Sequence, residues 1–369
     1  MHILLPGPTP VPNAVEQAML TAMTDHRGAL FEEVQTRVVE KLAAVFGAPS
    51  GQHVAIFPAS GTGGLEAAVQ NLLAPGDRVL AVETGLFGRR FSEIAEAHGI
   101  IVDRLEIPWG QAFDTADVLS RLEGFAYRAV LLTHNETSTG VLNPVADVAA
   151  ALKRAGSTIL VLVDSISGVP SIPLTLEDGI DVVIAASQKG FMCPPGLTML
   201  GFSDRGRDAV LAKRPGRFYF DCTPYLKGRL PYTPAISLWY GLDAALTLLA
   251  EEGEEARYAR HRQLRDIVRA YATAGGLTPL VADEVASPTV TALQLPATLN
   301  PSQWRKALAA RGLQISGGLG PWHDTVVRIG HVGYLDVADL WAGLALMAPE
   351  LPHPNAALEA ALQASFRHQ

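Results

Sequence analysis

Short apolar runs alternate with amphipathic stretches along the chain from about residue 53 onward. The runs are five or six residues long and rich in Val, Ile, Leu and Ala, which is typical of strands buried on both faces. They predict strands at residues 53–57, 78–82, 100–105, 129–133, 158–163, 181–186 and 197–202. Helical periodicity between them predicts helices at residues 64–73, 87–98, 115–122 and 145–155. Strands separated by helices predict an α/β fold, whose mostly parallel sheet is covered on both faces and binds ligands at the carboxyl ends of its strands.

The two ends of the chain follow other patterns. Residues 1–12 are predicted to form an extended, unpaired arm, because four prolines in this segment disfavour both helices and strand ladders. Downstream segments are predicted as helices at residues 31–46, 235–252, 254–273, 302–311, 337–347 and after Pro352, with strands at 289–293 and 325–329. We therefore predict three parts, an N-terminal arm (residues 1–14), a large domain (15–253) and a smaller C-terminal α+β domain (254–369).

The composition narrows the class of protein. A chain of 369 residues with 48% hydrophobic and 18% charged residues is typical of a soluble globular protein with a large core. Its net charge of −8 disfavours nucleic-acid and membrane partners, which require basic surfaces. The two cysteines, Cys193 and Cys222, provide neither a disulfide framework nor metal-ligand spacing, so no metal site is predicted. With no signal-peptide pattern and no apolar stretch that could span a bilayer, the sequence predicts a cytoplasmic enzyme.

One lysine differs from the others in its surroundings. Lys189 follows the apolar run 182–186 in a turn rich in Gly and Pro, whereas the remaining lysines lie in polar or Arg-bearing neighbourhoods. These are Lys41, Lys153, Lys213, Lys227 and Lys306. Burial at a strand end lowers the pKa of an amine and makes it nucleophilic. The alternative is a lysine whose charged end reaches solvent from the end of the strand.

Three further features lie in or beside predicted strands. Residues 59–64, Ala-Ser-Gly-Thr-Gly-Gly, join a strand to a helix, where small residues and the helix N-terminus favour a phosphate; a plain tight turn is the alternative. Asp164 follows the run 159–163, where a carboxylate requires a cation or hydrogen-bond donors unless it caps a helix. Arg328 lies within an apolar strand, and its guanidinium binds either a ligand carboxylate or an internal acidic partner.

Together these residues match the requirements of pyridoxal 5′-phosphate acting on an amino acid. The cofactor's aldehyde requires a lysine, its ring nitrogen an acid and its phosphate an anion site, while the substrate carboxylate requires a cation. Lys189, Asp164, residues 60–62 and Arg328 supply one of each. The glycines fit neither a Walker loop nor a dinucleotide fingerprint, whose third glycine falls on Glu66. A Rossmann-type dehydrogenase is therefore disfavoured.

The same motifs resemble the class V aminotransferases of fold type I, in particular the alanine–glyoxylate and serine–glyoxylate (serine–pyruvate) aminotransferases. The resemblance covers nearly the whole chain, and the motifs occur in the family's order. They are Leu5-Pro6-Gly7-Pro8-Thr9-Pro10, Ser60-Gly61-Thr62-Gly63, Thr133-His134-Asn135-Glu136-Thr137-Ser138-Thr139-Gly140, Val163-Asp164-Ser165, Ser187-Gln188-Lys189, Pro194-Pro195-Gly196, Thr233-Pro234-Ala235 and Arg328-Ile329-Gly330. The resemblance implies a mostly parallel, seven-stranded-type sheet in a large cofactor domain, a smaller C-terminal α+β domain, and a homodimer whose active sites are shared across the interface.

The resemblance also implies a role for each candidate residue. Lys189 would form the Schiff base with pyridoxal phosphate and move the proton during transfer, and Asp164 would pair with the ring nitrogen. Arg328 would bind the substrate carboxylate. The other implied cofactor contacts are Ser60, Gly61, Thr62 and Gln188 at the phosphate, Thr137 near the ring hydroxyl, Phe87 on the ring face, and Thr233, with Tyr232, at the phosphate of the other subunit.

Two positions depart from the family pattern. Phe87 replaces the tryptophan that is usual in the alanine–glyoxylate enzymes, and a phenyl ring still stacks on a cofactor ring. Leu230 occupies the position of the family's tyrosine three residues before the phosphate-binding threonine, which leaves the role of Tyr232 open. The segment 331–333 varies among relatives and is similar in the pyridoxamine–pyruvate type, against which the Ser-Gln-Lys motif at residues 187–189 argues.

The leading hypothesis is pyridoxal phosphate-dependent transfer of an amino group from alanine or serine to glyoxylate or pyruvate. Aspartate is an alternative donor, because an additional arginine such as Arg27 or Arg89 could bind its second carboxylate. Cysteine desulfuration requires a mobile thiol in the small domain, and no cysteine follows Cys222. A non-catalytic paralogue is disfavoured because every catalytic position carries a competent residue type. The substrate, the number of subunits beyond two, and the roles of His331 and the C-terminal tail are left open by the sequence.

Overall fold

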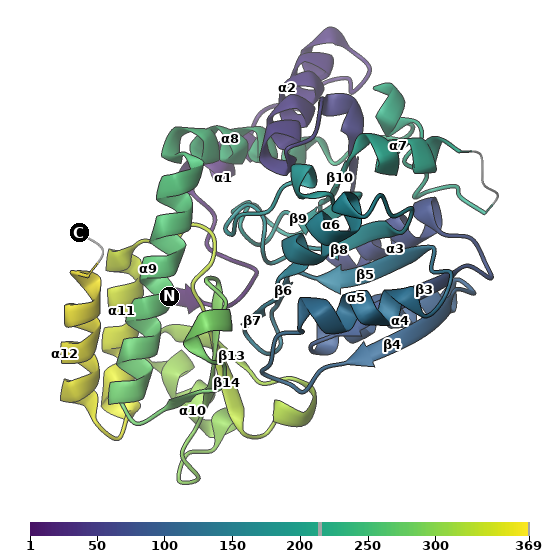
Figure 1. Cartoon of the computed structure of the whole chain (residues 1–369). Coiled ribbons are helices and arrows are strands. Elements are labelled where there is room, and N and C mark those ends of the chain that lie inside the picture. The colour runs from purple at the N-terminus through teal and green to yellow at the C-terminus, as the bar shows by residue number, and fades with distance from the viewer. Residues whose placement is uncertain (213–215, 368–369) are drawn as a thin grey trace.

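The computed structural model describes residues 1–212 and 216–367 and contains two main sheets (Figure 1). The larger sheet has seven strands in the order β2-β10-β9-β8-β5-β3-β4. Their bounds are Val54–Phe57 (β2), Arg78–Glu83 (β3), Ile101–Glu106 (β4), Ala129–Thr133 (β5), Leu160–Asp164 (β8), Val182–Ala186 (β9) and Thr198–Phe202 (β10). Neighbouring strands are parallel except at β10, which runs antiparallel to both β9 and β2. The predicted α/β fold with a mostly parallel sheet is thereby confirmed.

Helices cover both faces of this sheet, which explains the continuous apolar runs in the sequence. All five residues of β8 are buried, and the first four alternate between two apolar cores. Val161 and Val163 enter the core formed with helices on one face, whereas Leu160 and Leu162 enter the core on the other. The helices of the first core are α2 (Ala29–Phe46), α5 (Thr115–Glu123), α6 (Val145–Arg154) and α8 (Ile236–Glu252). Those of the second are α3 (Gly61–Leu72), α4 (Leu86–Ala97) and α7 (Asp204–Leu211).

The sheet brings three candidate segments to one edge. β2 and β9 are both antiparallel to β10, and β8 is parallel to β9, so the carboxyl ends of β2, β8 and β9 point the same way. β2 leads into α3 through Ser60, β8 ends at Asp164, and the loop after β9 carries Lys189. Ligands of parallel sheets bind at such an edge.

The second sheet is formed mainly by the C-terminal part of the chain, with α9, α11 and α12 packed beside it (Figure 1). Its strands, in the order β1-β13-β14-β12-β11, are His2–Leu4 (β1), Leu313–Gly317 (β13), Val326–Gly330 (β14), Val290–Gln294 (β12) and Thr278–Pro279 (β11). A separate apolar core joins the sheet to α9 (Glu254–Ala274), α10 (Pro301–Ala310), α11 (Val337–Met347) and α12 (Pro354–Ser365). The C-terminal helix α12 packs along α9, where the side chain of Gln263 donates to the carbonyl of Ser365 at 3.1 Å.

The N-terminal segment differs from the predicted unpaired arm. His2–Leu4 form β1, which pairs in parallel with β13, and the side chain of Leu4 is buried in the core of the second sheet. The ladder forms because the prolines begin only at Pro6, after this strand has ended. The first residues of the chain therefore belong to the sheet of its C-terminal part, and the prediction of an unpaired arm over residues 1–12 is wrong for residues 2–4.

A single glycine separates the last helix of the large sheet's part from the first helix of the C-terminal part. α8 ends at Glu252 and α9 begins at Glu254, and Gly253 between them has a φ of 76°. We propose the domain boundary at this glycine, as the sequence predicts, with β1 added to the smaller domain.

The elements that the sequence pattern did not predict are short. They are α1 (Asn13–Met19), the hairpin of β6 (Asn135–Glu136) and β7 (Val141–Leu142), α7, β1, β11 and β13, and the 3₁₀ helices Gly51–His53, Leu176–Asp178, Tyr225–Lys227, Asp283–Val285, Gly320–Trp322 and Ala348–Glu350. Lys213, one of the lysines compared above, lies outside the described residues. Across residues 1–212 and 216–367, no helix combines the length and the apolar character needed to cross a membrane.

Candidate active site

A cavity of about 140 Å³ lies at the carboxyl edge of the seven-stranded sheet. Eight of the residues predicted from the sequence line it, namely Ser60, Gly61, Thr62, Phe87, Thr137, Asp164, Gln188 and Lys189. Five more residues complete the wall, namely Leu65, Arg90, Asn135, Ile166 and Ser167. The structure therefore gathers at one place residues that are separated by more than a hundred positions in the sequence.

Lys189 is held in this cavity by a loop that is closed on itself. The hydroxyl of Ser187 donates to the carbonyl of Pro194 at 2.7 Å and accepts the N–H of Leu197 at 3.2 Å. The side chain of Lys189 is partly buried and its remaining exposure faces the cavity. Burial, followed by the charge of Arg328, lowers the pKa of the Lys189 amine to about 8. The alternative of a lysine that reaches bulk solvent does not fit this position.

The N-terminal segment covers Lys189 directly. The Lys189 amine donates to the carbonyl of Pro6, and the hydroxyl of Thr9 donates to the carbonyl of Lys189 at 3.2 Å. Gly7, between them, has a φ of 121°, and a Cβ atom there would lie 2.6 Å from Cδ of Lys189. Only glycine combines this backbone conformation with so close an approach.

Asp164 lies on the strand next to β9, at the end of β8. Its side chain is buried, and one carboxylate oxygen accepts the N–H of Ile166 at 3.0 Å. Within the described residues the other oxygen has no hydrogen-bond partner, and no helix begins at Asp164, so the alternative of a helix cap does not apply. Burial raises the pKa of the Asp164 carboxyl to about 7. A cation or donor placed beside it would lower that pKa again.

The segment after β2 forms the N-terminus of α3. Ser60 is the N-cap residue, but its side chain makes no capping hydrogen bond, so the first N–H groups of the helix are left for another acceptor. Gly61 packs closely against Ile166, since a Cβ atom there would lie 2.6 Å from Cδ1 of that side chain. Oε1 of Gln188, from the neighbouring loop, is buried without a partner among the described residues. The helix N–H groups suit an anion, whereas the Gln188 oxygen is an acceptor and requires a hydrogen-bond donor.

Phe87 is positioned by a carboxylate that the sequence analysis did not single out. Glu136 is fully buried, and its Oε2 accepts the N–H groups of Phe87 and Gly88, both at 3.1 Å, at the start of α4. Its Oε1 accepts the hydroxyl of Ser138 at 2.6 Å and the N–H of Ser138 at 3.0 Å. A buried carboxylate at a helix N-terminus is stabilised by these donors and by the helix dipole. Glu136 thereby fixes the turn from which the Phe87 side chain enters the cavity.

A hydroxyl and amide network forms another wall. Thr137 Oγ1 donates to Ser167 Oγ at 2.6 Å, and Asn135 Nδ2 donates to Ser167 Oγ at 2.8 Å and to Thr289 Oγ1 at 2.9 Å. Oδ1 of Asn135 is buried without a partner in the described part of the chain. Asn135 belongs to the motif over residues 133–140, which was the available sequence signal; Ser167 carried none.

Arg328 does not line the cavity, but it contacts the backbone of a residue that does. It lies in β14, is 7% exposed, and donates to the carbonyls of Gly317 and Thr137, both at 2.9 Å. Among the described residues no carboxylate lies within ion-pair distance of its guanidinium, so the alternative of an internal ion pair is not observed. Burial lowers the pKa of Arg328 to about 10, still well above neutrality. Its charge is therefore available to an acidic ligand.

Tyr232 and Thr233 lie away from this cavity. The ring of Tyr232 stacks on that of Tyr219 with centroids 5.3 Å apart, and its hydroxyl donates to the carbonyl of Phe218 at 3.0 Å. Thr233 is exposed. The structure does not bring these two residues to the cavity of their own chain, and their predicted contact with a partner's phosphate stays a prediction.

The arginine in the cavity is not one of those considered from the sequence. Arg27 is exposed, and Arg89 is exposed on α4 with its Nε 3.7 Å from a carboxylate oxygen of Glu83. The next residue of α4, Arg90, lines the cavity instead. Its Nη1 lies 3.5 Å from the hydroxyl of Thr62, and its guanidinium lies 5.0 Å from the ring centroid of Phe87.

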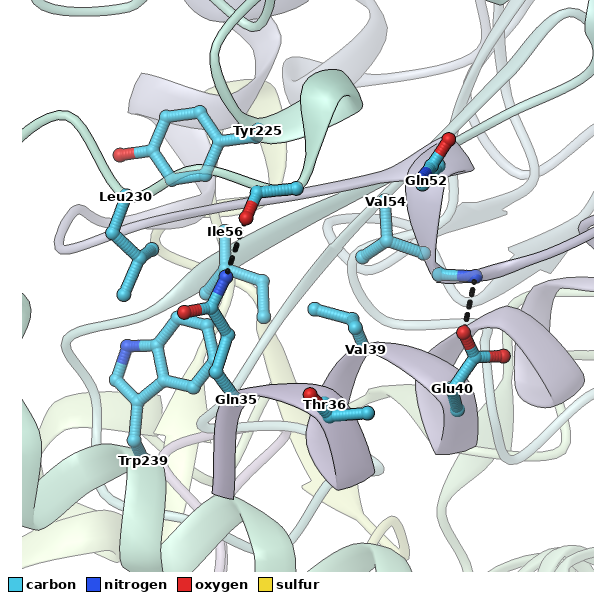
Figure 2. A pocket seen from close by; sticks show the side chains of 12 residues that line it. Gln35, Thr36, Val39, Glu40, Gln52, Val54, Ile56, Tyr225, Leu230 and Trp239 are labelled. Carbon is cyan, nitrogen blue, oxygen red and sulfur yellow. Dashed lines mark hydrogen bonds between the residues drawn. The ribbon is translucent and has the colours of Figure 1, made fainter. Parts of the chain in front are cut away.

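A second cavity, of about 160 Å³, lies beside β2 and between α2 and α8 (Figure 2). Figure 2 shows two hydrogen bonds at its rim, from the Gln35 amide to the carbonyl of Gly228 (3.4 Å) and from the N–H of Gly51 to Glu40 (3.2 Å). Among the described residues of its wall, Glu40 alone is charged. Its described lining contains no amine and no free acid, so the candidate chemistry belongs to the cavity around Lys189.

Comparisons with known proteins agree with this geometry. The family model described as aminotransferase class-V matches residues 6–330. This chain belongs to the class V aminotransferases. It is therefore an enzyme of the aminotransferase type, and the resemblance noted from its motifs is confirmed.

The similarity to two relatives and to one solved structure extends over almost the whole chain. The L-aspartate–glyoxylate aminotransferase of Paracoccus denitrificans is 36% identical over 353 residues, which cover 93% of this chain and 89% of the relative. The serine–glyoxylate aminotransferase of Hyphomicrobium methylovorum is 38% identical over 363 residues, covering 95% and 89%. The crystal structure of ureidoglycine–glyoxylate aminotransferase from Bacillus subtilis superimposes with a TM-score of 0.92 at 28% identity, covering 99% and 98% of the two chains.

Proposed function

We propose that this class V aminotransferase uses pyridoxal 5′-phosphate to move an amino group from a small amino acid, alanine or serine, to glyoxylate or pyruvate. The observation that carries the proposal is the shielded amine of Lys189, with its lowered pKa, in one cavity with the buried carboxyl of Asp164. The names of all three proteins compared above contain glyoxylate, which supports it as the acceptor.

The cavity residues fit this cofactor on an observation of their own. Oε1 of Gln188 and Oδ1 of Asn135 are buried polar atoms that lack partners within the described residues. Buried polar atoms without partners are rare in folded proteins and indicate a missing hydrogen-bonding group. The free oxygen of Asp164 and the uncapped N-terminus of α3 add an acceptor and a set of donors. Together they supply what a phosphorylated, protonated heterocycle requires.

Each of these residues would have a separate role in the proposed reaction. When bound, pyridoxal phosphate supplies an aldehyde that captures amino groups and a protonated ring that withdraws electrons. Lys189 would hold the aldehyde, Asp164 the protonated ring nitrogen, and Phe87 one face of the ring. The Lys189 amine would take the proton from the substrate's α-carbon and deliver it to the carbon of the cofactor's aldehyde group, and a pKa of about 8 suits a base at neutral pH.

Arg328 would bind the substrate's α-carboxylate. Its guanidinium has no acidic partner in the described part of the chain and contacts the backbone of Thr137 at the cavity wall. A bidentate pair between guanidinium and carboxylate fixes orientation as well as charge. This orientation brings the α-carbon toward Lys189.

The test of the reaction is a panel of transamination assays. Alanine, serine, aspartate and glutamate are offered as donors against glyoxylate, pyruvate and 2-oxoglutarate, and we expect the highest kcat/KM for alanine or serine with glyoxylate or pyruvate. Lys189→Ala should lower turnover by at least about 100-fold, whereas the exposed Lys153→Ala should not. A fully active Lys189→Ala enzyme would rule out the mechanism.

A second pair of variants tests the carboxylate site. Arg328→Lys loses the bidentate geometry and should raise KM for both amino and oxo acids by about 10-fold or more. The control is Arg311→Lys, because Arg311 is half-exposed, is paired with Glu350 at 2.8 Å and has no part in the proposed substrate site. Equal KM values in Arg328→Lys and the unaltered enzyme would remove Arg328 from the substrate site.

Aspartate as donor is a second candidate, favoured by one observation. Arg90 lines the cavity in addition to the arginine assigned to the α-carboxylate, and the Paracoccus relative is named for aspartate. The donor panel separates the two proposals, since a dicarboxylate-specific enzyme prefers aspartate over alanine and serine by a large factor.

We also propose a homodimer in which Thr233 reaches the partner's phosphate. Leu20, Leu30 and Phe218 are large apolar side chains that are 84%, 69% and 80% exposed, and Tyr232 packs against Phe218. Exposed apolar groups of this size are typical of an interface. Light scattering should give about 78 kDa, twice the 39.2 kDa of one chain. Phe218→Glu should reduce that mass, while Phe125→Glu, at another exposed phenylalanine (60%), should not; a monomeric unaltered enzyme would refute the assembly.

We propose a cytoplasmic location on the chemistry of the thiols. Cys193 and Cys222 are both free and buried, as is typical of proteins from reducing compartments. Fractionation of cells that express the tagged protein tests this directly, and recovery from a secreted or membrane fraction would contradict it.

A further inference from the structure

Arg90 is a cation in the cavity to which the family motifs assign no role. It lies one turn into α4, lines the cavity, and has no carboxylate within ion-pair distance in the described part of the chain. Its neighbour Arg89 differs, because it points outward to Glu83. A guanidinium that is partly buried and unpaired is costly unless a ligand brings an anion to it.

The contacts of Arg90 place it beside the predicted anion cradle rather than beside the substrate carboxylate site. Nη1 lies 3.5 Å from Oγ1 of Thr62, the second residue of α3. The charge of Arg90 also lowers the pKa of Asp164, whereas the charge of Arg328 acts on Lys189. The two arginines thus act on different residues of the site.

The cradle itself carries little charge. The N-terminus of α3 contributes partial positive charge, and Gln188 is neutral. A phosphate monoester carries close to two negative charges at neutral pH, and charge-assisted hydrogen bonds from a guanidinium are the usual way to neutralise it. Lys189 and Arg328 are occupied by other roles in the proposed reaction.

We infer that Arg90 is an anion-binding residue that pairs with the 5′-phosphate of the cofactor at the N-terminus of α3. This inference rests on the proposed use of pyridoxal phosphate. Arg90 also lies over the ring of Phe87, at 5.0 Å from its centroid, so the residue that neutralises the phosphate also steadies the ring that faces the cofactor. One side chain therefore couples the two ends of the cofactor site.

The test is a binding titration of cofactor-free protein, which does not require turnover. Dissociation constants are measured for pyridoxal 5′-phosphate and for pyridoxal, which lacks the phosphate, with unaltered protein, Arg90→Gln and Arg90→Lys. We expect Arg90→Gln to weaken pyridoxal phosphate binding by about 10–100-fold and pyridoxal binding by no more than about 3-fold. Arg90→Lys, which keeps the charge, should recover part of the loss. Arg89→Gln is the matched control and should bind both compounds normally.

The outcomes separate this inference from the proposed function. If the unaltered protein binds no pyridoxal phosphate, the proposed function fails and this inference with it. Normal pyridoxal phosphate binding by Arg90→Gln overturns the inference alone. The same result with a raised KM for aspartate, but not for serine, would reassign Arg90 to the second carboxylate of a substrate. Equal weakening for pyridoxal and its phosphate also overturns it, because that pattern indicates a structural role through Phe87.

Discussion

Replacing Gly7 by Ala places a methyl group directly against the Lys189 side chain. A Cβ atom at Gly7 would lie 2.6 Å from Cδ, 2.8 Å from Cε and 2.8 Å from Nζ of Lys189. Ordinary contacts begin near 3.4 Å, so the lysine must retreat by about 0.8 Å at Cδ. Displacements of about 1 Å at a reacting group cost on the order of 100-fold in rate, and we expect a loss of that size.

The stability of Gly7→Ala should fall much less than its activity. The groups that must move are the end of a flexible side chain, so the main energetic cost is alanine at a φ of 121°, about 1–3 kcal/mol. Gly76→Ala provides the matched control, because Gly76 also has a positive φ, of 88°, but its added Cβ meets nothing within 4 Å. Both variants should therefore lose comparable stability, and only Gly7→Ala should lose function.

Three measurements decide this prediction. Thermal unfolding of the cofactor-free proteins compares stability, borohydride reduction followed by mass spectrometry counts cofactor joined to Lys189, and steady-state assays give kcat. We expect substoichiometric labelling and low kcat for Gly7→Ala and normal values for Gly76→Ala. Full labelling and an unchanged kcat in Gly7→Ala would refute the idea that Gly7 leaves the space that the lysine occupies.

Three further predictions concern buried polar groups. Burial raises the pKa of Asp164 to about 7 in the folded protein, from an ordinary 3.8. The cofactor-free protein should therefore lose up to about 4 kcal/mol of stability as pH rises from about 4 to 7. Denaturation measured over this pH range should show a smaller loss for Asp164→Asn. Glu136→Gln places an amide N–H₂ group against the N–H and hydroxyl donors of Ser138 or against the N–H donors of α4. Calorimetry should therefore show a free energy of unfolding that is lower by about 1–3 kcal/mol. The control Glu66→Gln, at a half-exposed residue, should leave the free energy of unfolding unchanged. Arg257→Met leaves the carbonyl of Pro170 unpaired and removes one of the two donors to the carbonyl of Leu249, so chemical denaturation should show a loss of about 1–3 kcal/mol; an unchanged midpoint would exclude this role.

The strands of the large sheet could be predicted because a strand buried on both faces is a continuous apolar run in the sequence. β5, β8 and β9 read as continuous apolar runs, and their bounds in the structure lie within two residues of those predicted. The direction of β10 was not predictable, since an apolar run is the same in either orientation. The hairpin of β6 and β7 has only two residues in each strand, too few to show a period. The pairing of β1 depends on β13, at the opposite end of the sequence, and no local pattern encodes it.

In the candidate site, too, the residues marked by local sequence could be predicted and those placed by distant contacts could not. Lys189 and Asp164 were recognisable because a charge at the end of an apolar strand conflicts with its surroundings. Arg90 was not, because its orientation depends on where α4 begins. That start is fixed at Leu86 by Ser138 and by Glu136, about fifty residues further along the chain. A shift of one residue in the helix start would have turned Arg89 toward the cavity instead.

The pairing of β1 with β13 also determines when the catalytic lysine acquires its cover. Among the described strands, β1 is synthesised first, whereas its partner in the sheet, β13, is synthesised after all the strands of the large sheet. Until β13 has been synthesised, β1 has no neighbour and the residues that lie over Lys189 have no anchor. The large sheet can form before β13 has been made, whereas the cover over the lysine can form only after it. The order of synthesis therefore predicts that protein truncated before β13 contains the large sheet but leaves Lys189 without its cover.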